Sequence, residues 1–209
     1  PGLAEQWQKK ALELQPDLDV AHQGLITLFI AFGEFEKAIG QSRAHLAKMT
    51  GSMGAMMFAA RAELFSGRNE KAQEYYQKIL AQESIRHIDS VRVESGSIHW
   101  RAGRMDEARK LFERSLDRMK RRLEQGDEDP YIGFYTAAIH AVQGNKEEAL
   151  NWLQRAVDAG WREYRYVLRY PLFENIRDDA RFKRIVDEMK AKVTEMRRRV
   201  EEMERDSLK

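Results

Sequence analysis

The 209-residue chain is 33% charged and 43% hydrophobic, and its 36 basic and 34 acidic residues leave a net charge of +2. This near balance argues against the strong long-range attraction for nucleic acid that a basic protein has. The absence of cysteine excludes a disulfide framework and thiolate chemistry, and no apolar run approaches the ~20 residues of a membrane-spanning helix. We therefore expect a soluble helical protein of the cytoplasm.

Four turns of the form Gly-x-x-x-x-Ala recur along the chain. They run from Gly33 to Ala38, Gly67 to Ala72, Gly103 to Ala108 and Gly144 to Ala149. Glycine best tolerates the left-handed backbone just past a helix end, so each glycine predicts the end of one helix. Polar or acidic residues follow, and we expect them to cap or complement the start of a second helix. The alanine, one turn into that helix, leaves room for two helices to cross closely.

In chain order, Leu3 to Pro16 is predicted to be one amphipathic helix ended by proline. Its Ala4 precedes Ala38 by 34 residues, the next interval is again 34, and those that follow are 36 and 41. This period, with its Gly-x4-Ala turn, an aromatic residue four positions after the alanine and a closing proline, resembles the tetratricopeptide repeat. In that register a half repeat at 3–16 precedes four repeats at about 19–50, 53–84, 87–125 and 130–158.

The resemblance implies an all-α fold, a right-handed superhelix whose repeats line a concave groove with their first helices. The register places the following residues in that groove: Met57, Arg61, Phe65, Val93, Ser97, Trp100, Arg101 and Phe134. Aromatic and apolar residues among cations suit a peptide or protein partner with an acidic group. In the alternative interpretation, Phe65 and Trp100 are only core between repeats. A clamp for a C-terminal carboxylate is not matched, because Gln23 and Thr27 stand where the family has lysine and asparagine.

Two segments interrupt the repeat period. The third repeat is seven residues longer than the 34-residue period, about two helical turns, so its second helix should overhang its neighbours. After Gly160 an aromatic and arginine-rich stretch at 161–173 is expected to cover the last repeat as an irregular cap, because an array needs a covered end. We therefore divide the chain into a repeat array with its cap at 1–170 and a C-terminal capping helix region at 171–209.

The C-terminal region contains a heptad stripe. Its apolar residues alternate in spacing between four and three: Phe182, Val186, Met189, Val193, Met196, Val200 and Met203. This spacing predicts a long helix from about 179 to 206 whose first part packs on the repeats and whose last turns project. Its last four stripe residues are candidates for homodimerisation. The basic residues that flank the stripe disfavour a parallel pair, so packing on the chain's own array is the preferred interpretation.

From Tyr170 onward the chain also resembles the C-terminal part of bacterial signalling proteins. In these proteins a tetratricopeptide array follows an adenylate-cyclase or winged-helix domain. The resemblance implies that this chain is part of a larger bacterial signalling protein, with its output activity on another domain.

No pattern predicts catalysis, a metal site or a cofactor. The five histidines, none at a metal-binding spacing, are expected to be core residues: His22, His45, His87, His99 and His140. Basic residues could bind nucleic acid through a run at 114–122 and through Arg162, Arg165 and Arg169, which alternate with aromatics. Neighbouring acids favour a solvated helix and a cap instead. We therefore predict a non-enzymatic protein-interaction or regulatory module. The alternatives are an oligomerisation module of a catalytic or DNA-binding protein and direct nucleic-acid binding.

Overall fold

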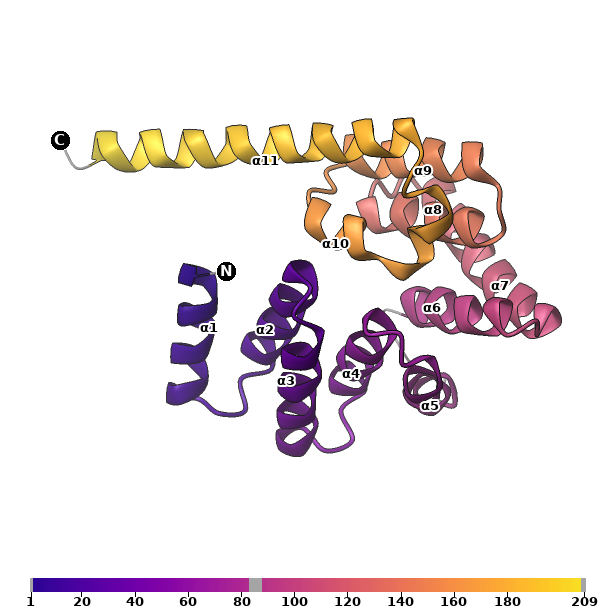
Figure 1. Cartoon of the computed structure of the whole chain (residues 1–209), viewed down its shortest axis with the longest axis horizontal. Helices are drawn as coiled ribbons and strands as arrows, with labels where there is room; N and C mark the ends of the chain where they lie inside the picture. The colour runs from indigo at the N-terminus through magenta and orange to yellow at the C-terminus, as the bar shows by residue number, and fades with distance from the viewer. Residues whose placement is uncertain (1, 83–87, 208–209) are drawn as a thin grey trace. The chain divides into compact units, whose positions relative to one another are not determined.

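The computed structural model of the chain describes residues 2–82 and 88–207 (Figure 1). These residues form helices joined by short connections and include no β-strand. The predicted all-α fold of helix-turn-helix repeats is confirmed. His87, and the predicted repeat ends at residues 84 and 87, lie outside the described residues.

After a first helix, α1 (Gly2–Leu14), the helices follow in pairs (Figure 1). The pairs are α2 (Asp19–Phe32) with α3 (Phe35–Lys48), α4 (Met53–Phe65) with α5 (Asn69–Leu80), α6 (Ile88–Arg101) with α7 (Met105–Glu124), and α8 (Pro130–Val142) with α9 (Lys146–Asp158). The residue range of each pair corresponds to one predicted repeat. The helix α7 has 20 residues, against 14 in α3, 12 in α5 and 13 in α9, so the second helix of the third repeat is the long one, as predicted.

The four turn glycines have the predicted left-handed backbone. Their φ angles are 79° at Gly33, 82° at Gly67, 75° at Gly103 and 83° at Gly144. The alanine that follows each of them is 0% exposed: Ala38, Ala72, Ala108 and Ala149. The turn therefore does both things predicted of it, because it ends one helix and brings the next into close contact.

Of the two roles predicted for the residues after each glycine, only complementing the helix dipole is observed at α3, α5 and α9. Their N-cap residues, Glu34, Arg68 and Asn145, form no side-chain cap hydrogen bond. The tight turn gives these residues ψ angles of 57°, 65° and 70°, short of the extended conformation that directs a side chain toward the free amides. Acidic residues in the first turn of each helix, such as Glu36 and Glu70, complement the helix dipole instead.

The chain folds as two compact units. Unit 1 comprises Pro1–Ser115 and Arg169–Pro171, and unit 2 comprises Leu116–Leu168 and Leu172–Lys209. The division falls inside α7. The core of unit 1 includes Leu25, Ile30, Leu64 and Tyr76, each at most 1% exposed.

Three further elements follow, α10 (Tyr164–Arg169), the 3-10 helix η1 (Pro171–Ile176) and α11 (Ala180–Ser207). Apart from Arg169–Pro171 they belong to unit 2. The aromatic stretch predicted to be a cap packs on α8. The ring of Phe134 stacks on Trp161 with centroids 4.1 Å apart and meets the edge of Phe173 at 5.3 Å. These contacts cover the end of the last helix pair.

The helix α11 has a buried first half and an exposed second half. Phe182, Ile185, Val186 and Met189 are at most 5% exposed, and this half packs against α9. Further along the stripe Val193 is half-buried. The outermost stripe residues are largely exposed, at 56% for Met196, 48% for Val200 and 63% for Met203. In the described part of the chain no helix is long and apolar enough to span a membrane.

Candidate functional site

Seven of the eight predicted groove residues lie in unit 1, and the eighth, Phe134, lies on α8 in unit 2. Met57, Arg61 and Phe65 are on α4, and Val93, Ser97, Trp100 and Arg101 are on α6. Val93, Ser97 and Phe134 are 0% exposed, so their side chains fill the core and do not line a surface.

Met57 and Trp100 are half-buried and contact neighbouring helices. The sulfur of Met57 accepts a hydrogen bond from the Ser90 hydroxyl at 3.8 Å. The ring centroid of Trp100 lies 6.1 Å from that of Phe112 on α7. Trp100 therefore fits the alternative interpretation, in which it packs between the two helices of its own repeat.

The remaining predicted residues, Arg61, Phe65 and Arg101, lie around the segment that carries Tyr170. Tyr170 is 0% exposed and belongs to unit 1, although Leu168 and Leu172 on either side of it belong to unit 2. Its ring centroid lies 5.7 Å from that of Phe65 at the end of α4. Its hydroxyl donates to Oε1 of Glu94 on α6 at 3.3 Å. Both apolar and polar contacts thus hold this side chain.

Glu94 is a carboxylate with 0% exposure. The Arg61 Nε donates to its two oxygens at 3.1 and 3.2 Å, and the Tyr76 hydroxyl donates to Oε2 at 3.0 Å. Together with Tyr170 these groups give the buried charge a cation and two hydroxyl donors. A buried carboxylate needs such partners, because leaving water without them costs several kcal/mol.

The Arg169–Pro171 segment also contacts the rest of unit 1 through its backbone and through Arg169. Arg101, exposed at the end of α6, donates to the carbonyl oxygen of Pro171 at 2.6 Å. At the turn before α3, a Cβ on Gly33 would lie 3.1 Å from Nε of Arg169, so glycine allows the guanidinium to approach the backbone closely. We call the five residues around Tyr170 the Tyr170 site: Arg61, Phe65, Tyr76, Glu94 and Arg101.

Arg61, Phe65 and Arg101 are among the groove residues predicted from the sequence, whereas Tyr76, Glu94 and Tyr170 are not. One signal could have found Glu94. It follows Arg61 by 33 residues, about one repeat, so opposite charges occupy nearly equivalent places on successive first helices. Tyr170 carried no such signal because it lies outside the repeats.

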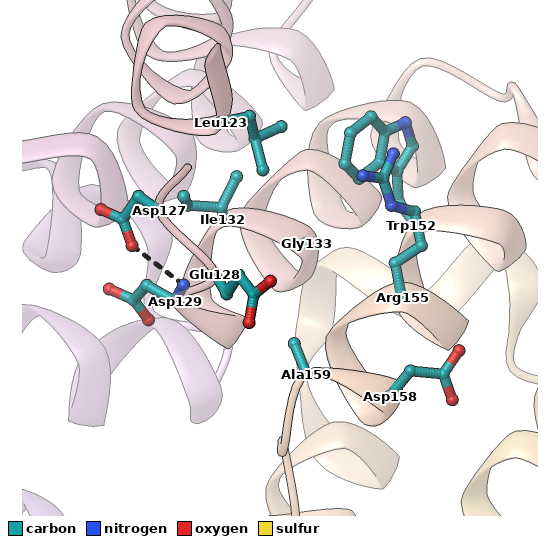
Figure 2. A pocket seen from close by; sticks show the side chains of 10 residues that line it. All are labelled: Leu123, Asp127, Glu128, Asp129, Ile132, Gly133, Trp152, Arg155, Asp158 and Ala159. Atoms are coloured by element: carbon teal, nitrogen blue, oxygen red, sulfur yellow. Dashed lines mark hydrogen bonds between the residues drawn. The ribbon is translucent and has the colours of Figure 1, made fainter. Parts of the chain in front are cut away.

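Unit 2 contains a cavity of about 310 Å³ (Figure 2). Its lining combines aliphatic residues, four carboxylates and a stacked pair in which the Arg155 guanidinium lies 4.2 Å from the ring centroid of Trp152. The carboxylates belong to Asp127, Glu128, Asp129 and Asp158.

The acids on one side of this cavity have structural partners. Arg122 donates to Asp127 and to Asp129 at 2.8 Å each, and Asp129 accepts the Tyr131 N–H at the start of α8. Figure 2 shows the bond from the Asp129 N–H to Asp127. That bond and Arg122 lower the pKa of Asp127. These contacts order the α7–α8 connection.

The histidines in the described part of the chain occupy structural positions. His45 is 0% exposed, its Nε2–H donates to Asp19 at 2.6 Å, and its ring stacks on His22 with centroids 4.8 Å apart. Burial lowers the pKa of His45, and likewise of His99 and His140. Among residues 2–82 and 88–207 no three histidine or acidic side chains are grouped as a metal site.

The basic residues considered for nucleic acid also have internal contacts. Arg122 bonds to two aspartates. Two arginines of the cap likewise contact residues of the chain itself. Arg162 donates to the carbonyls of Val157 and Trp161 at 2.6 and 2.8 Å, and the Arg165 guanidinium lies 5.1 Å from the ring centroid of Tyr164. These contacts favour the structural interpretation of both basic stretches.

Residues 88–160, which span α6 to α9, match the family described as Tetratricopeptide repeat. A search of the curated proteins found no match. Among solved structures, the chain is similar to the APC/C hetero-tetramer Cut9-Hcn1, with a TM-score of 0.56 and 10% identity over 90% of this chain and 35% of that chain. For Pseudomonas aeruginosa pilF the TM-score is 0.49 and the identity 17%, over 90% of this chain and 81% of that one. For YrrB, a TPR protein with an unusual peptide-binding site, the TM-score is 0.45 and the identity 17%, over 89% of this chain and 92% of that one.

Proposed function

We propose that the chain is a protein-interaction module that binds a peptide of a partner protein at the Tyr170 site of unit 1. Tetratricopeptide repeats generally serve as scaffolds for protein–protein contacts. The observation that carries the proposal is that the site already holds the short segment where α10 ends and η1 begins, with Tyr170 buried and the Pro171 carbonyl bonded to Arg101.

This combination of contacts is typical of peptide recognition. A side chain anchored in a buried position supplies affinity, and hydrogen bonds to the backbone fix the direction of the peptide. Phe65 and Arg101 come from the ends of two first helices, and aromatic residues and arginine are enriched at protein interfaces. The predicted acidic group of the partner is not needed for these contacts, because Arg101 donates to a carbonyl oxygen.

We also propose a wider setting for this module. The C-terminal resemblance supports a place in a larger bacterial signalling protein of the cytoplasm, whose catalytic or DNA-binding activity lies on another domain. In that setting the module contributes recognition and no chemistry of its own.

A displayed peptide library panned against the full chain tests the proposal. Arg61→Glu is a poor variant because it places a second carboxylate beside the buried Glu94. Arg101→Glu is better, because Arg101 is exposed. We expect this variant to weaken enriched peptides at least tenfold, measured by fluorescence polarisation. Arg43→Glu, the same charge reversal at an exposed position of α3, is the matched control.

Two outcomes would contradict peptide binding at this site. In one, no peptide is enriched over a library panned against empty resin. In the other, the two charge-reversal variants weaken binding equally, which would indicate a general electrostatic effect.

Self-association through α11 is a second candidate function. It is favoured by the exposure of Met196, Val200 and Met203, which continue a stripe that is buried in the first half of the helix. A second copy could cover these residues by pairing with the same stripe.

A further inference from the structure

On the basis of the proposed function, we infer that the Arg169–Pro171 segment is an internal competitor for the site, and that the partner peptide carries a tyrosine followed by proline. The partner must therefore displace the chain's own segment. The tyrosine follows from the contacts of Tyr170 with Phe65 and Glu94, and the proline follows from the backbone conformation that it imposes on the preceding residue.

The site recognises both the ring and the hydroxyl of a phenol. Phe65 presents an aromatic surface to the ring of Tyr170, and Glu94 accepts from the hydroxyl at 3.3 Å. Arg61 and Tyr76 fix the position of the carboxylate. A phenylalanine would keep the ring contact and leave the acceptor without this donor. A phosphotyrosine would bring a second negative group against a buried carboxylate, which is strongly unfavourable.

Proline suits the next position for a conformational reason. The residue before a proline is restricted to extended backbone, so tyrosine enters the site with less conformational entropy to lose. Proline also lacks an N–H, and the contact used here is its carbonyl, which accepts from Arg101 at 2.6 Å. The chain's own segment thus satisfies the site without an amide donor at this position.

Two observations support occupation of the site by the chain's own segment: the burial of Tyr170 and the position of the segment in the chain. Tyr170 is 0% exposed, so no second tyrosine can enter while it is in place. The segment is a three-residue excursion into unit 1 from a part of the chain that otherwise belongs to unit 2. Partner binding and this excursion are therefore mutually exclusive.

The experiment uses the full chain and a fluorescent peptide of residues 167–173. Tyr170→Ala removes the internal tyrosine, and we expect it to bind this peptide at least tenfold more tightly than the wild type. Tyr164→Ala, which removes a half-buried tyrosine of α10 outside the site, should bind like the wild type. Against Tyr170→Ala, peptides with phenylalanine, alanine or phosphotyrosine at position 170 should bind progressively worse than the tyrosine peptide.

Equal peptide affinity for the wild type and the Tyr170→Ala variant would overturn the inference, and so would an equal gain in Tyr164→Ala. If library peptides without a Tyr-Pro motif bind in an Arg101-dependent way, the proposed function stands and the inference falls. If no peptide binds the wild type or Tyr170→Ala, both fall.

A second measurement covers the possibility that Tyr170→Ala fails to fold. The chain has no cysteine, so Pro171→Cys introduces a single thiol and keeps Tyr170. Adding an excess of the 167–173 peptide should accelerate labelling of this thiol by a maleimide at least threefold, because the segment is displaced. An unchanged labelling rate would contradict displacement.

Discussion

Glu94 shows how one residue can link several elements of a repeat fold. Its carboxylate has no exposed surface, yet donors from α4, α5 and the Arg169–Pro171 segment surround it. Such a buried charge is stable only while its partners remain, because desolvation and pairing nearly cancel. The residue therefore gives geometric specificity more than net stability.

We predict that Glu94→Ala lowers the free energy of unfolding by about 3–5 kcal/mol, the usual cost of removing one partner of a buried ion pair. Arg61, with a side chain only 13% exposed, would lose its counter-ion. Urea unfolding followed by circular dichroism measures the change. An exposed carboxylate of α7 provides the control, since Glu113→Ala should stay within about 0.5 kcal/mol of the wild type. A similar loss in both variants would contradict the role of Glu94.

We expect His45 to make the stability of unit 1 depend on pH. Burial, together with the neighbouring His22, lowers its pKa in the folded state, and the Asp19 carboxylate only partly opposes this. Its Nδ1 has no hydrogen-bond partner in the described part of the chain, so a second proton would be a buried charge without an acceptor. The unfolded chain, with an ordinary histidine pKa of about 6.5, therefore binds this proton first.

Above pH ~6.5 His45 is neutral in both states and contributes nothing; as the pH falls below that value the unfolded state gains protons and stability decreases. We predict a lower urea midpoint at pH 5.5 than at pH 7.5, and a smaller difference in His45→Gln. The opposite slope, or an unchanged slope in the variant, would show that His45 does not titrate in this way.

At the scale of elements, the two halves of α11 differ in burial. Its first half is part of the core through Phe182 and Met189, both 0% exposed. Its second half contains ion pairs within the helix. Arg198 and Arg199 both pair with Glu195 and lower its pKa to about 2. The heptad pattern predicted the helix but did not mark where burial ends, because the spacing is the same in both halves.

We predict that a chain ending at Glu195 unfolds at the same temperature as the full chain, because the removed stripe residues are exposed. Phe182→Ala, in the buried half, should cost about 3–5 kcal/mol through the cavity it leaves. Thermal unfolding by circular dichroism compares the three proteins. A truncation as destabilising as the Phe182 variant would indicate that the outer turns are packed.

The repeat pairs were predictable to within a few residues, whereas the Tyr170 site was only partly so. Each turn glycine acts locally through its own φ angle, and a local rule recurs wherever the same residues recur. Tyr170 and Glu94 are 76 residues apart, and Tyr170 belongs to no repeat. Neither periodicity nor spacing can pair two such residues. The burial of Val93 and Ser97 was missed because a helix register gives a face but not the depth of that face.

At the scale of the whole molecule, the exposed stripe bears on oligomeric state. The exposed part, Met196 to Met203, spans about one heptad, and helices this short associate weakly. Basic residues flank it at Lys190, Lys192 and Arg197. We predict a monomer near 10 µM and partial dimerisation near 1 mM, increasing when 0.5 M salt screens these charges.

Light scattering across this concentration range measures the effect. A chain ending at Glu195 is the control and should stay monomeric throughout. A stable dimer at 10 µM, or association that the truncation leaves unchanged, would place the interface elsewhere.

The covalent tether of Tyr170 sets a threshold on recognition. A tethered ligand has an effective concentration in the millimolar range when its linkers are short, so free peptide competes against a ligand that is always present. If the segment fills the site about 99% of the time, a partner's apparent affinity falls about 100-fold below its intrinsic value. The chain would then ignore dilute peptides and respond only to a partner held nearby, or after Tyr170 itself has been made unable to bind.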